Sequence, residues 1–297
     1  MRTMLGHDVA KVWAAGTQDR GRNHSRGNVY FEGDTIYSYG THFPMAVRLP
    51  KLFILNADTY STSTSRHQDM VRGAVRGSPQ ILVPLSALRR MGIELRTIRL
   101  VEVGPDREIK RTCKRVHESR WERRQPGYQK PEAVAHEHES HLLGQSVFES
   151  AGRFYLSGTD ETARDAWRAY FLVELPPGRG EPRSVANALN LLEPAAVAGA
   201  RANGRVVLRQ GEWYFVAAPS PNTPIQAELK DALLPNPDGS RGHHKVTRLA
   251  FDPYGGMYAK GTVRHTGRDH KMLVLKGWHA VYRNTAVRAA SAGGRVD

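Results

Sequence analysis

The amino-acid sequence predicts an α+β fold, in which a mixed α/β N-terminal part is followed by a β-rich part made of antiparallel hairpins. The first part shows helix-compatible apolar spacing, whereas the last ninety residues or so show short apolar runs separated by Gly and Pro turns. A chain of 297 residues has room for two modest domains. We expect these domains over residues 1–125 and 146–283, with a linker or helix over 126–145 between them.

The N-terminal part begins with a helix and a hairpin. Apolar residues at helical spacing predict a short amphipathic helix within residues 4–19. Two short strands over residues 29–39 flank Gly33-Asp34, a pair that supplies the positive φ values of a tight turn. In this hairpin Tyr37 and Tyr39 are expected to share one face.

A buried strand and a second helix are expected next. The run Leu52–Leu55 is continuously apolar, which indicates a buried strand. Ser65 and Gln68 have the spacing of a capping box, so we predict a helix from about Arg66 to Val75. His67 would then lie in the first turn, where the positive helix end disfavours a protonated imidazole.

Residues 107–124 combine many bases with an apolar stripe. If the segment is helical, Ile109, Cys113 and Val116 form that stripe and most bases lie on the other faces. Either a solvated surface helix or a nucleic-acid contact explains this pattern. The eight bases are Arg107, Lys110, Arg111, Lys114, Arg115, Arg120, Arg123 and Arg124.

The second domain is predicted to hold helices near 161–169 and 183–202, followed by strands. A hairpin turns at Gln210-Gly211, and further strands follow around 245–251, 257–263 and 276–277. Residues 284–297 carry few large apolar side chains, so we expect a disordered tail.

Composition narrows the partners. The chain has 43 Lys and Arg against 29 Asp and Glu, a net charge of +14, which favours a nucleic acid or, alternatively, an acidic protein. Cys113 is the single cysteine, so neither a disulfide framework nor a cysteine zinc cluster is expected. The sequence shows no apolar run suited to export or membrane insertion, and we expect a cytoplasmic protein that does not bind membranes.

Two groups of histidines bear on chemistry. His136, His138 and His141 lie close in sequence, and on a helix the last two would be neighbours, but they form no complete metal-ligand set. The sequence also lacks phosphate-loop and dinucleotide-binding motifs. We therefore expect no metal and no cofactor.

The C-terminal histidines suggest a catalytic alternative. His244, Lys245 and His265 lie at predicted strand ends, where they would act as base, acid and electrostatic stabiliser in metal-independent phosphodiester cleavage. His270 and His279 follow nearby. The competing interpretation is that these are solvated polar turn residues.

The aromatic segment over residues 28–44 also has two interpretations. Its tyrosines form either a stacking platform for single-stranded nucleic acid or ordinary strand packing. The candidate nucleic-acid-binding residues are Tyr37, Tyr39, His42, Arg66, His67, Arg107, Lys110, Arg111, Lys114 and Arg115.

Four segments carry a resemblance to a known family: Asn28–Ala46, Ser61–Gln68, Arg209–Phe215 and Gly261–His265. Together they resemble an uncharacterised family of proteins encoded by bacteriophages and plasmids. The resemblance implies a mobile-element setting and no mechanism. The leading hypothesis is a nucleic-acid-binding protein. The alternatives are the nuclease with C-terminal histidines and a virion-associated or protein-interaction component.

Overall fold

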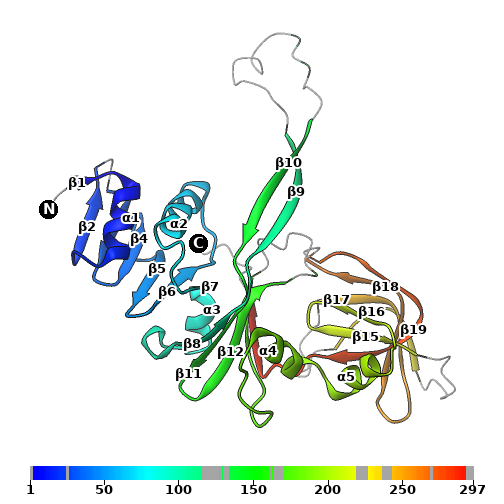
Figure 1. The fold of residues 1–297 in the computed structure, drawn as a ribbon. Helices are drawn as coiled ribbons and strands as arrows, with labels where there is room; N and C mark the ends of the chain where they lie inside the picture. The colour runs from blue at the N-terminus through cyan, green and yellow to red at the C-terminus, as the bar shows by residue number, and fades with distance from the viewer. Residues whose placement is uncertain are drawn as a thin grey trace. The chain divides into compact units, whose positions relative to one another are not determined.

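The protein is described by a computed structural model over residues 3–24, 27–115, 127, 129, 134–160, 162, 170–218, 227–235, 243–267 and 270–291. The fold is α+β, as predicted, although strands dominate it (Figure 1). The chain divides into two units. One comprises residues 1–104 together with 145–297, and the other is the inserted segment Pro105–Gly144. The division thus differs from the predicted boundary near residue 125, because the chain returns to the first unit after the insertion.

The N-terminal sheet follows sequence order, and Figure 1 shows it in blue. The pairs from β2 to β6 are antiparallel, while β1 with β2 and β6 with β7 are parallel. The expected hairpin at Gly33-Asp34 is confirmed as β3 and β4. The strands are β1 (Thr3–Met4), β2 (Arg20–Asn23), β3 (Val29–Glu32), β4 (Thr35–Ser38), β5 (Pro44–Leu49), β6 (Leu52–Asn56) and β7 (Gln80–Val83).

Helices accompany this sheet. Helix α1 (Gly6–Ala15) confirms the predicted N-terminal helix and buries Val9 and Trp13. Helix α2 (Thr62–Ala74) begins earlier than predicted, because the Ser61 hydroxyl, and not that of Ser65, caps it by accepting a hydrogen bond from the Thr64 amide. His67 is therefore beyond the first turn. Helix α3 (Leu85–Arg90) and the 3₁₀ turn η1 (Leu95–Thr97) follow β7.

Gln68 serves the fold in a different way from the predicted cap. Its side-chain amide donates to the carbonyl oxygens of Asn56 and Asp58, at 2.9 and 3.0 Å, and so joins α2 to the end of β6. The Asn56 side chain accepts from the Asp58 and Leu85 amides. These buried hydrogen bonds fix the chain as it leaves the strand.

A second, antiparallel sheet has the order β20-β13-β12-β11-β8. Phe148, Tyr155 and Leu172 from this sheet share one core with Ile54 and Ile81 of the N-terminal sheet. The strands are β8 (Arg99–Val103), β11 (Ser146–Ser150), β12 (Arg153–Thr159), β13 (Tyr170–Glu174) and β20 (Arg288–Ser291). The prediction of a disordered tail is wrong for β20, because this strand pairs with β13. Arg288 also forms an ion pair with the buried Glu174.

Two short helices separate the second sheet from the third. Helix α4 (Val185–Leu192) and helix α5 (Ala195–Ala202) replace the single helix expected over 183–202, because Pro194 caps the second helix and interrupts the first. Helix α4 packs on the second sheet and α5 on Tyr214 and Val216 of the third. The helix predicted near 161–169 lies outside the described residues apart from Thr162, which is in a turn.

The C-terminal sheet, yellow to red in Figure 1, has the order β14-β15-β19-β18-β17-β16 and is antiparallel throughout. Gly261 and Gly277 adopt positive φ values of 91° and 104° in its two longest strands. One face of the sheet encloses its own apolar core, which includes Trp213, Val246 and Val263. The strands are β14 (Val207–Gln210), β15 (Trp213–Ala217), β16 (Ala227–Leu233), β17 (His244–Phe251), β18 (Met257–His265) and β19 (Leu273–Arg283).

The inserted unit is a hairpin of β9 (Arg107–Arg115) and β10 (Val134–Leu142). The predicted basic helix is therefore wrong over 107–115, and residues 116–124 lie outside the described part. The helical neighbours His138 and His141 are likewise on a strand, where the register sets them opposite Arg111 and Glu108. Pairing along a second strand satisfies the backbone of β9, which a helix would satisfy internally.

Candidate metal centre

Two predicted site residues meet at one end of the C-terminal sheet. His244 begins β17, His265 ends β18, and the antiparallel register makes them direct partners. Cross-strand partners have side chains on the same face. Their imidazole centroids are 4.8 Å apart, with the rings at 67°. The hairpin itself therefore brings the two histidines together.

His270 completes the group from the turn that follows β18. Its ring centroid lies 4.8 Å from that of His265 and 5.5 Å from that of His244. One ring nitrogen from each of the three residues lies within 4.8 Å of the other two. We call His244, His265 and His270 the three-histidine cluster.

His244 is buried in a form suited to metal binding. Its side chain is 1% exposed, and neither ring nitrogen has a hydrogen-bond partner among the described residues. Burial lowers the pKa of this imidazole to about 3 from its usual 6.5, with smaller contributions from the nearby charges of His265, His270, His243 and Arg283. The ring is therefore neutral at pH 7, which is the protonation state that coordinates a metal.

Oxygen atoms face the far nitrogens of two of these rings. Nδ1 of His270 lies 3.3 Å from the Thr162 hydroxyl and 3.8 Å from a carboxylate oxygen of Asp160. The Thr162 hydroxyl in turn donates to Asp160 at 2.8 Å. Nδ1 of His244 lies 3.6 Å from Oε1 of Glu212. Carboxylates behind metal-binding histidines orient the rings and raise their basicity.

Gly211 leaves space where the other nitrogens converge. A Cβ atom at this position would lie 3.2 Å from Nε2 of His244 and 3.3 Å from Nε2 of His270. The residue has a positive φ of 57°, and its amide donates to the Thr162 hydroxyl at 2.9 Å. The β14–β15 turn thus presents backbone, and no side chain, to the cluster.

Three imidazole ligands suit zinc, copper, nickel or iron. A zinc ion bound to three protein ligands keeps a fourth position for water or substrate, the usual composition of a catalytic zinc site. Nitrogens that share one tetrahedral zinc lie about 3.4 Å apart, given zinc–nitrogen distances of about 2.1 Å. A bound zinc ion would therefore draw the ring nitrogens, which lie within 4.8 Å of one another, closer together. The sequence did not predict this candidate metal site.

Other predicted residues lie elsewhere. Lys245 is exposed, next to His244 in a strand and hence on the opposite face, with its ammonium nitrogen 3.7 Å from Asp231. His279 is buried, and its Nδ1 lies 3.1 Å from the Gly277 carbonyl oxygen. The exposed His243 has its ring 5.7 Å from that of His265. The structure therefore brings His244 and His265 together, as the predicted catalytic group requires, but it does not bring Lys245 to them.

The aromatic segment is split between two faces. Tyr37 stacks on Tyr30 at 5.2 Å. Tyr39 instead has a positive φ of 63°, and its half-exposed ring lies 5.5 Å from His67. The expectation that Tyr37 and Tyr39 share a face is wrong, because this backbone turn breaks the strand alternation after Ser38.

His67 is neutralised by burial. Burial lowers the pKa of His67, and its Nδ1 lies 2.8 Å from the Ser38 hydroxyl. The ring of exposed His42 lies 6.3 Å from that of Tyr60, while Arg66 is exposed on α2. The side chains of Arg107, Lys110, Arg111, Lys114 and Arg115 lie outside what the structure describes.

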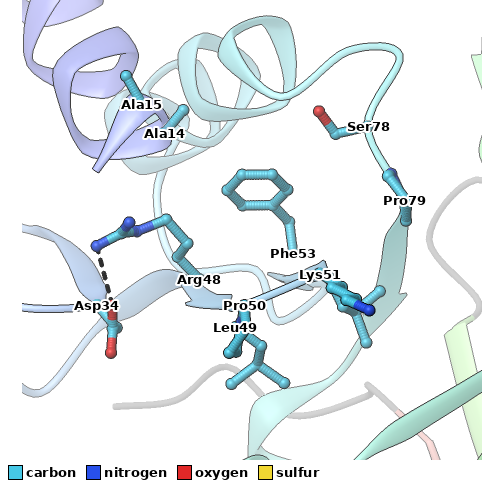
Figure 2. A pocket seen from close by; sticks show the side chains of 11 residues that line it. Ala14, Ala15, Asp34, Arg48, Leu49, Pro50, Lys51, Phe53, Ser78 and Pro79 are labelled. Atoms are coloured by element: carbon cyan, nitrogen blue, oxygen red, sulfur yellow. Dashed lines mark hydrogen bonds and ion pairs between the residues drawn. The ribbon is translucent and has the colours of Figure 1, made fainter. Parts of the chain in front are cut away.

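A separate hollow of about 720 Å³ lies beside the β5–β6 turn. Figure 2 shows Arg48 at its edge, bound to Asp34 at 2.9 Å, with Phe53 and Lys51 on other sides. Of the three charged residues that line it, Arg48 and Asp34 pair with each other, which leaves Lys51. We assign the hollow no chemistry.

Sequence reasoning missed the roles of His270, Gly211, Thr162 and Asp160. In the sequence His270 lies in a polar turn and Gly211 in a hairpin turn. Turn formation alone accounts for both residues, so neither one indicates a site. The available signal was the shared end of the predicted C-terminal strands.

No family model, no curated protein and no solved structure matches this chain. Among the described residues, helices are too short or too polar to cross a membrane.

Proposed function

We propose that this chain is a metalloprotein that binds one divalent transition-metal ion, zinc foremost, through His244, His265 and His270. The observation that carries the proposal is the buried, neutral His244, whose two nitrogens lack hydrogen-bond partners in the described structure while its Nε2 borders the same small space as that of His270. Burial of an unsatisfied polar group is costly, and a metal ion would satisfy it.

The fourth coordination position points to a catalytic type of centre. Three protein ligands leave room for a water molecule, and zinc lowers the pKa of such a water to about 7. The class of reaction is therefore hydrolysis or hydration by a metal-bound hydroxide. This chain contributes the three imidazoles and the oxygens of Glu212, Thr162 and Asp160 that lie beside two of them.

The metal-independent nuclease is less well supported by the same geometry. An acid and base pair needs one histidine that gains and loses a proton near pH 7. The pKa of His244, lowered to about 3 mainly by burial, makes this ring a poor proton carrier. Lys245, the intended electrostatic stabiliser, faces away.

Metal content after purification without chelator tests the proposal. We expect about one equivalent of zinc per chain, and we expect the His265→Ala variant to lose it. The matched control is His279→Ala, because His279 is also buried in the C-terminal sheet but bonds to Gly277. Absence of zinc from the wild type even after incubation with excess metal, or equal zinc in the His265→Ala variant, would reject the proposal.

Nucleic-acid binding is a second proposed function. With it we propose that the protein acts in the cytoplasm and belongs to a mobile genetic element. Nucleic-acid binding is supported by the net charge of +14, by the half-exposed Tyr39, whose ring lies 5.5 Å from that of His67, and by the exposed Arg66 that precedes His67. The inserted unit adds little, since residues 105–144 hold nine Lys and Arg against seven Asp and Glu. The charge that would attract nucleic acid belongs mostly to the other unit.

Binding of labelled single-stranded RNA and DNA at increasing salt tests this second function. The logarithm of the affinity should fall linearly with the logarithm of salt concentration. Tyr39→Ala should weaken binding about tenfold, since stacking on one base contributes about 1–3 kcal/mol. Tyr254→Ala is the control, because Tyr254 is 91% exposed in the turn between β17 and β18. If the protein binds RNA and DNA no more tightly than it binds a neutral polymer, nucleic acid is excluded as the partner. An acidic protein would then be the partner to test.

A further inference from the structure

Polar atoms without partners extend beyond the three-histidine cluster. Gln210 is 1% exposed, and its Oε1 has no hydrogen-bond partner among the described residues. Nε of Arg283 is buried and likewise has none there. Buried donors and acceptors of this kind are uncommon in folded proteins, and a bound water, ion or ligand is one way to satisfy them.

The β14–β15 turn brings Gln210 and, through pairing with Trp213, Arg283 toward the cluster, and the charge of Arg283 acts on His244. Gln210 pairs with Trp213, and Trp213 pairs with Arg283, so the three form one row across β14, β15 and β19. Cross-strand partners share a face, and Trp213 lies in the core enclosed by the sheet. The row adjoins Gly211 and Glu212, the two residues that border His244.

Further hydrogen bonds hold this corner together. The Gln210 side-chain amide donates to the carbonyl oxygens of Lys271 at 2.5 Å and Val263 at 3.4 Å, on either side of His265 and His270. The Asn284 amide donates to the Glu212 carbonyl oxygen at 2.8 Å. Gln210 is therefore held by residues that flank His265 and His270, and Arg283 precedes Asn284, which is bound to the β14–β15 turn.

A guanidinium beside a metal ion is unfavourable unless an anion lies between them. The carboxylates beside the cluster are Glu212, near His244, and Asp160, near His270, and their two negative charges do not balance a divalent ion and a guanidinium. Arginine binds oxyanions through charge-assisted hydrogen bonds, whereas a metal-bound water can donate to an acceptor such as Gln210 Oε1.

We propose that the metal centre accepts a ligand with an oxyanion group, a phosphate or a carboxylate, which has one oxygen on the metal and another on Arg283. This inference rests on the proposed metal centre and names its substrate class. Gln210 would position the metal-bound water or a protonated oxygen of the ligand. A substrate of the centre is then an anionic ester or acid and not a neutral molecule.

Titration of cobalt-loaded protein tests the inference. Cobalt(II) replaces zinc in nitrogen-ligand sites and absorbs visible light, so inorganic phosphate or acetate bound at the metal changes the spectrum. Metal content is measured separately on the same samples. We expect saturable changes with phosphate, acetate or both, and the stronger of the two identifies the class of oxyanion.

Arg283→Met is the decisive variant. It should retain one cobalt and weaken oxyanion binding by about 10-fold to 100-fold, the effect of losing a charge-assisted hydrogen bond. The matched control Arg264→Met makes the same charge change next to His265 but on the exposed face of β18, and it should bind like the wild type. If the methionine variant does not fold, Arg283→Lys replaces it and should show a smaller weakening.

The outcomes separate the two proposals. One cobalt per chain without a spectral response to either anion overturns the oxyanion inference and leaves the metal centre standing. Equal anion affinity in the wild type and the Arg283 variants also overturns it. Failure of the wild type to bind cobalt or zinc overturns the metal centre itself.

Discussion

His244 and His265 are direct partners across the β17–β18 ladder, with their ring centroids 4.8 Å apart. Two adjacent imidazoles held by a hairpin cannot both be protonated without repulsion. Since burial lowers the pKa of His244, this ring remains neutral and is available to bind a cation together with His265. Metal binding by the three-histidine cluster depends on this pair, whereas the stability of the N-terminal sheet depends on packing elsewhere in the chain.

Gly211→Ala should abolish or strongly weaken metal binding. The added Cβ would enter the space bordered by Nε2 of His244 and His270. Gly33→Ala is the matched control, because Gly33 has nearly the same positive φ, 56° against 57°, but nothing within 4 Å of the added carbon. Both variants should lose about 1 kcal/mol of stability from backbone strain. Isothermal titration with zinc should show the loss of affinity in Gly211→Ala alone.

The metal-free protein should lose stability as the pH falls below 6.5. The pKa of His244 is lowered to about 3 by burial, so between these values the unfolded chain binds a proton that the folded chain does not. The free energy of unfolding then falls by about 1.4 kcal/mol per pH unit from this residue. Urea titrations at several pH values should show a shallower dependence in His244→Gln. Equal slopes in the two proteins would contradict the burial of a neutral ring.

Thr162→Val should weaken zinc binding about tenfold, the lower range for loss of a group that orients a metal ligand. The hydroxyl accepts from the Gly211 amide, donates to Asp160 and lies 3.3 Å from Nδ1 of His270. Thr247→Val is the control, since the Thr247 hydroxyl bonds Thr262 on an exposed face. Competition with a coloured chelator measures both affinities, and unchanged binding in the Thr162 variant would remove this residue from the site.

Gly16→Ala should destabilise the N-terminal sheet by about 2 kcal/mol. Gly16 ends α1 with a φ of 66°, and a Cβ there would overlap the guanidinium of Arg48, which pairs with Asp34 (Figure 2). Strain alone accounts for about half of this loss. Gly77→Ala, at φ 85° with open space around it, should show only that half in urea unfolding. A similar loss in both variants would mean that Arg48 moves aside without cost.

Local features of the fold followed from the sequence, and non-local ones did not. The turn at Gly33-Asp34 and the apolar stripe of α1 are short-range patterns that the structure confirms. The helical spacing of Ile109, Cys113 and Val116 predicts a helix over this segment. The segment instead forms strand β9, because its hydrogen bonds come from β10, about twenty residues away. Strand β20 depends on an edge offered by β13, more than a hundred residues earlier.

The candidate site shows the same limit. His244 and His265 were selected because both lie at predicted strand ends, and one register then makes them partners. Lys245 was included by its closeness in sequence, although alternation along a strand sends it to the other face. Thr162 and Asp160 reach His270 from beyond the end of a different sheet. Periodicity within a segment carries no information about such a meeting.

X-ray absorption at the zinc edge of the zinc-loaded protein tests the central claim most directly. The account predicts about three nitrogen neighbours at about 2.0 Å, with the outer-shell scattering of imidazole rings and one further light atom. Loss of one imidazole contribution is expected in His270→Ala. A zinc ion surrounded by oxygen without imidazole scattering would contradict the three-histidine centre.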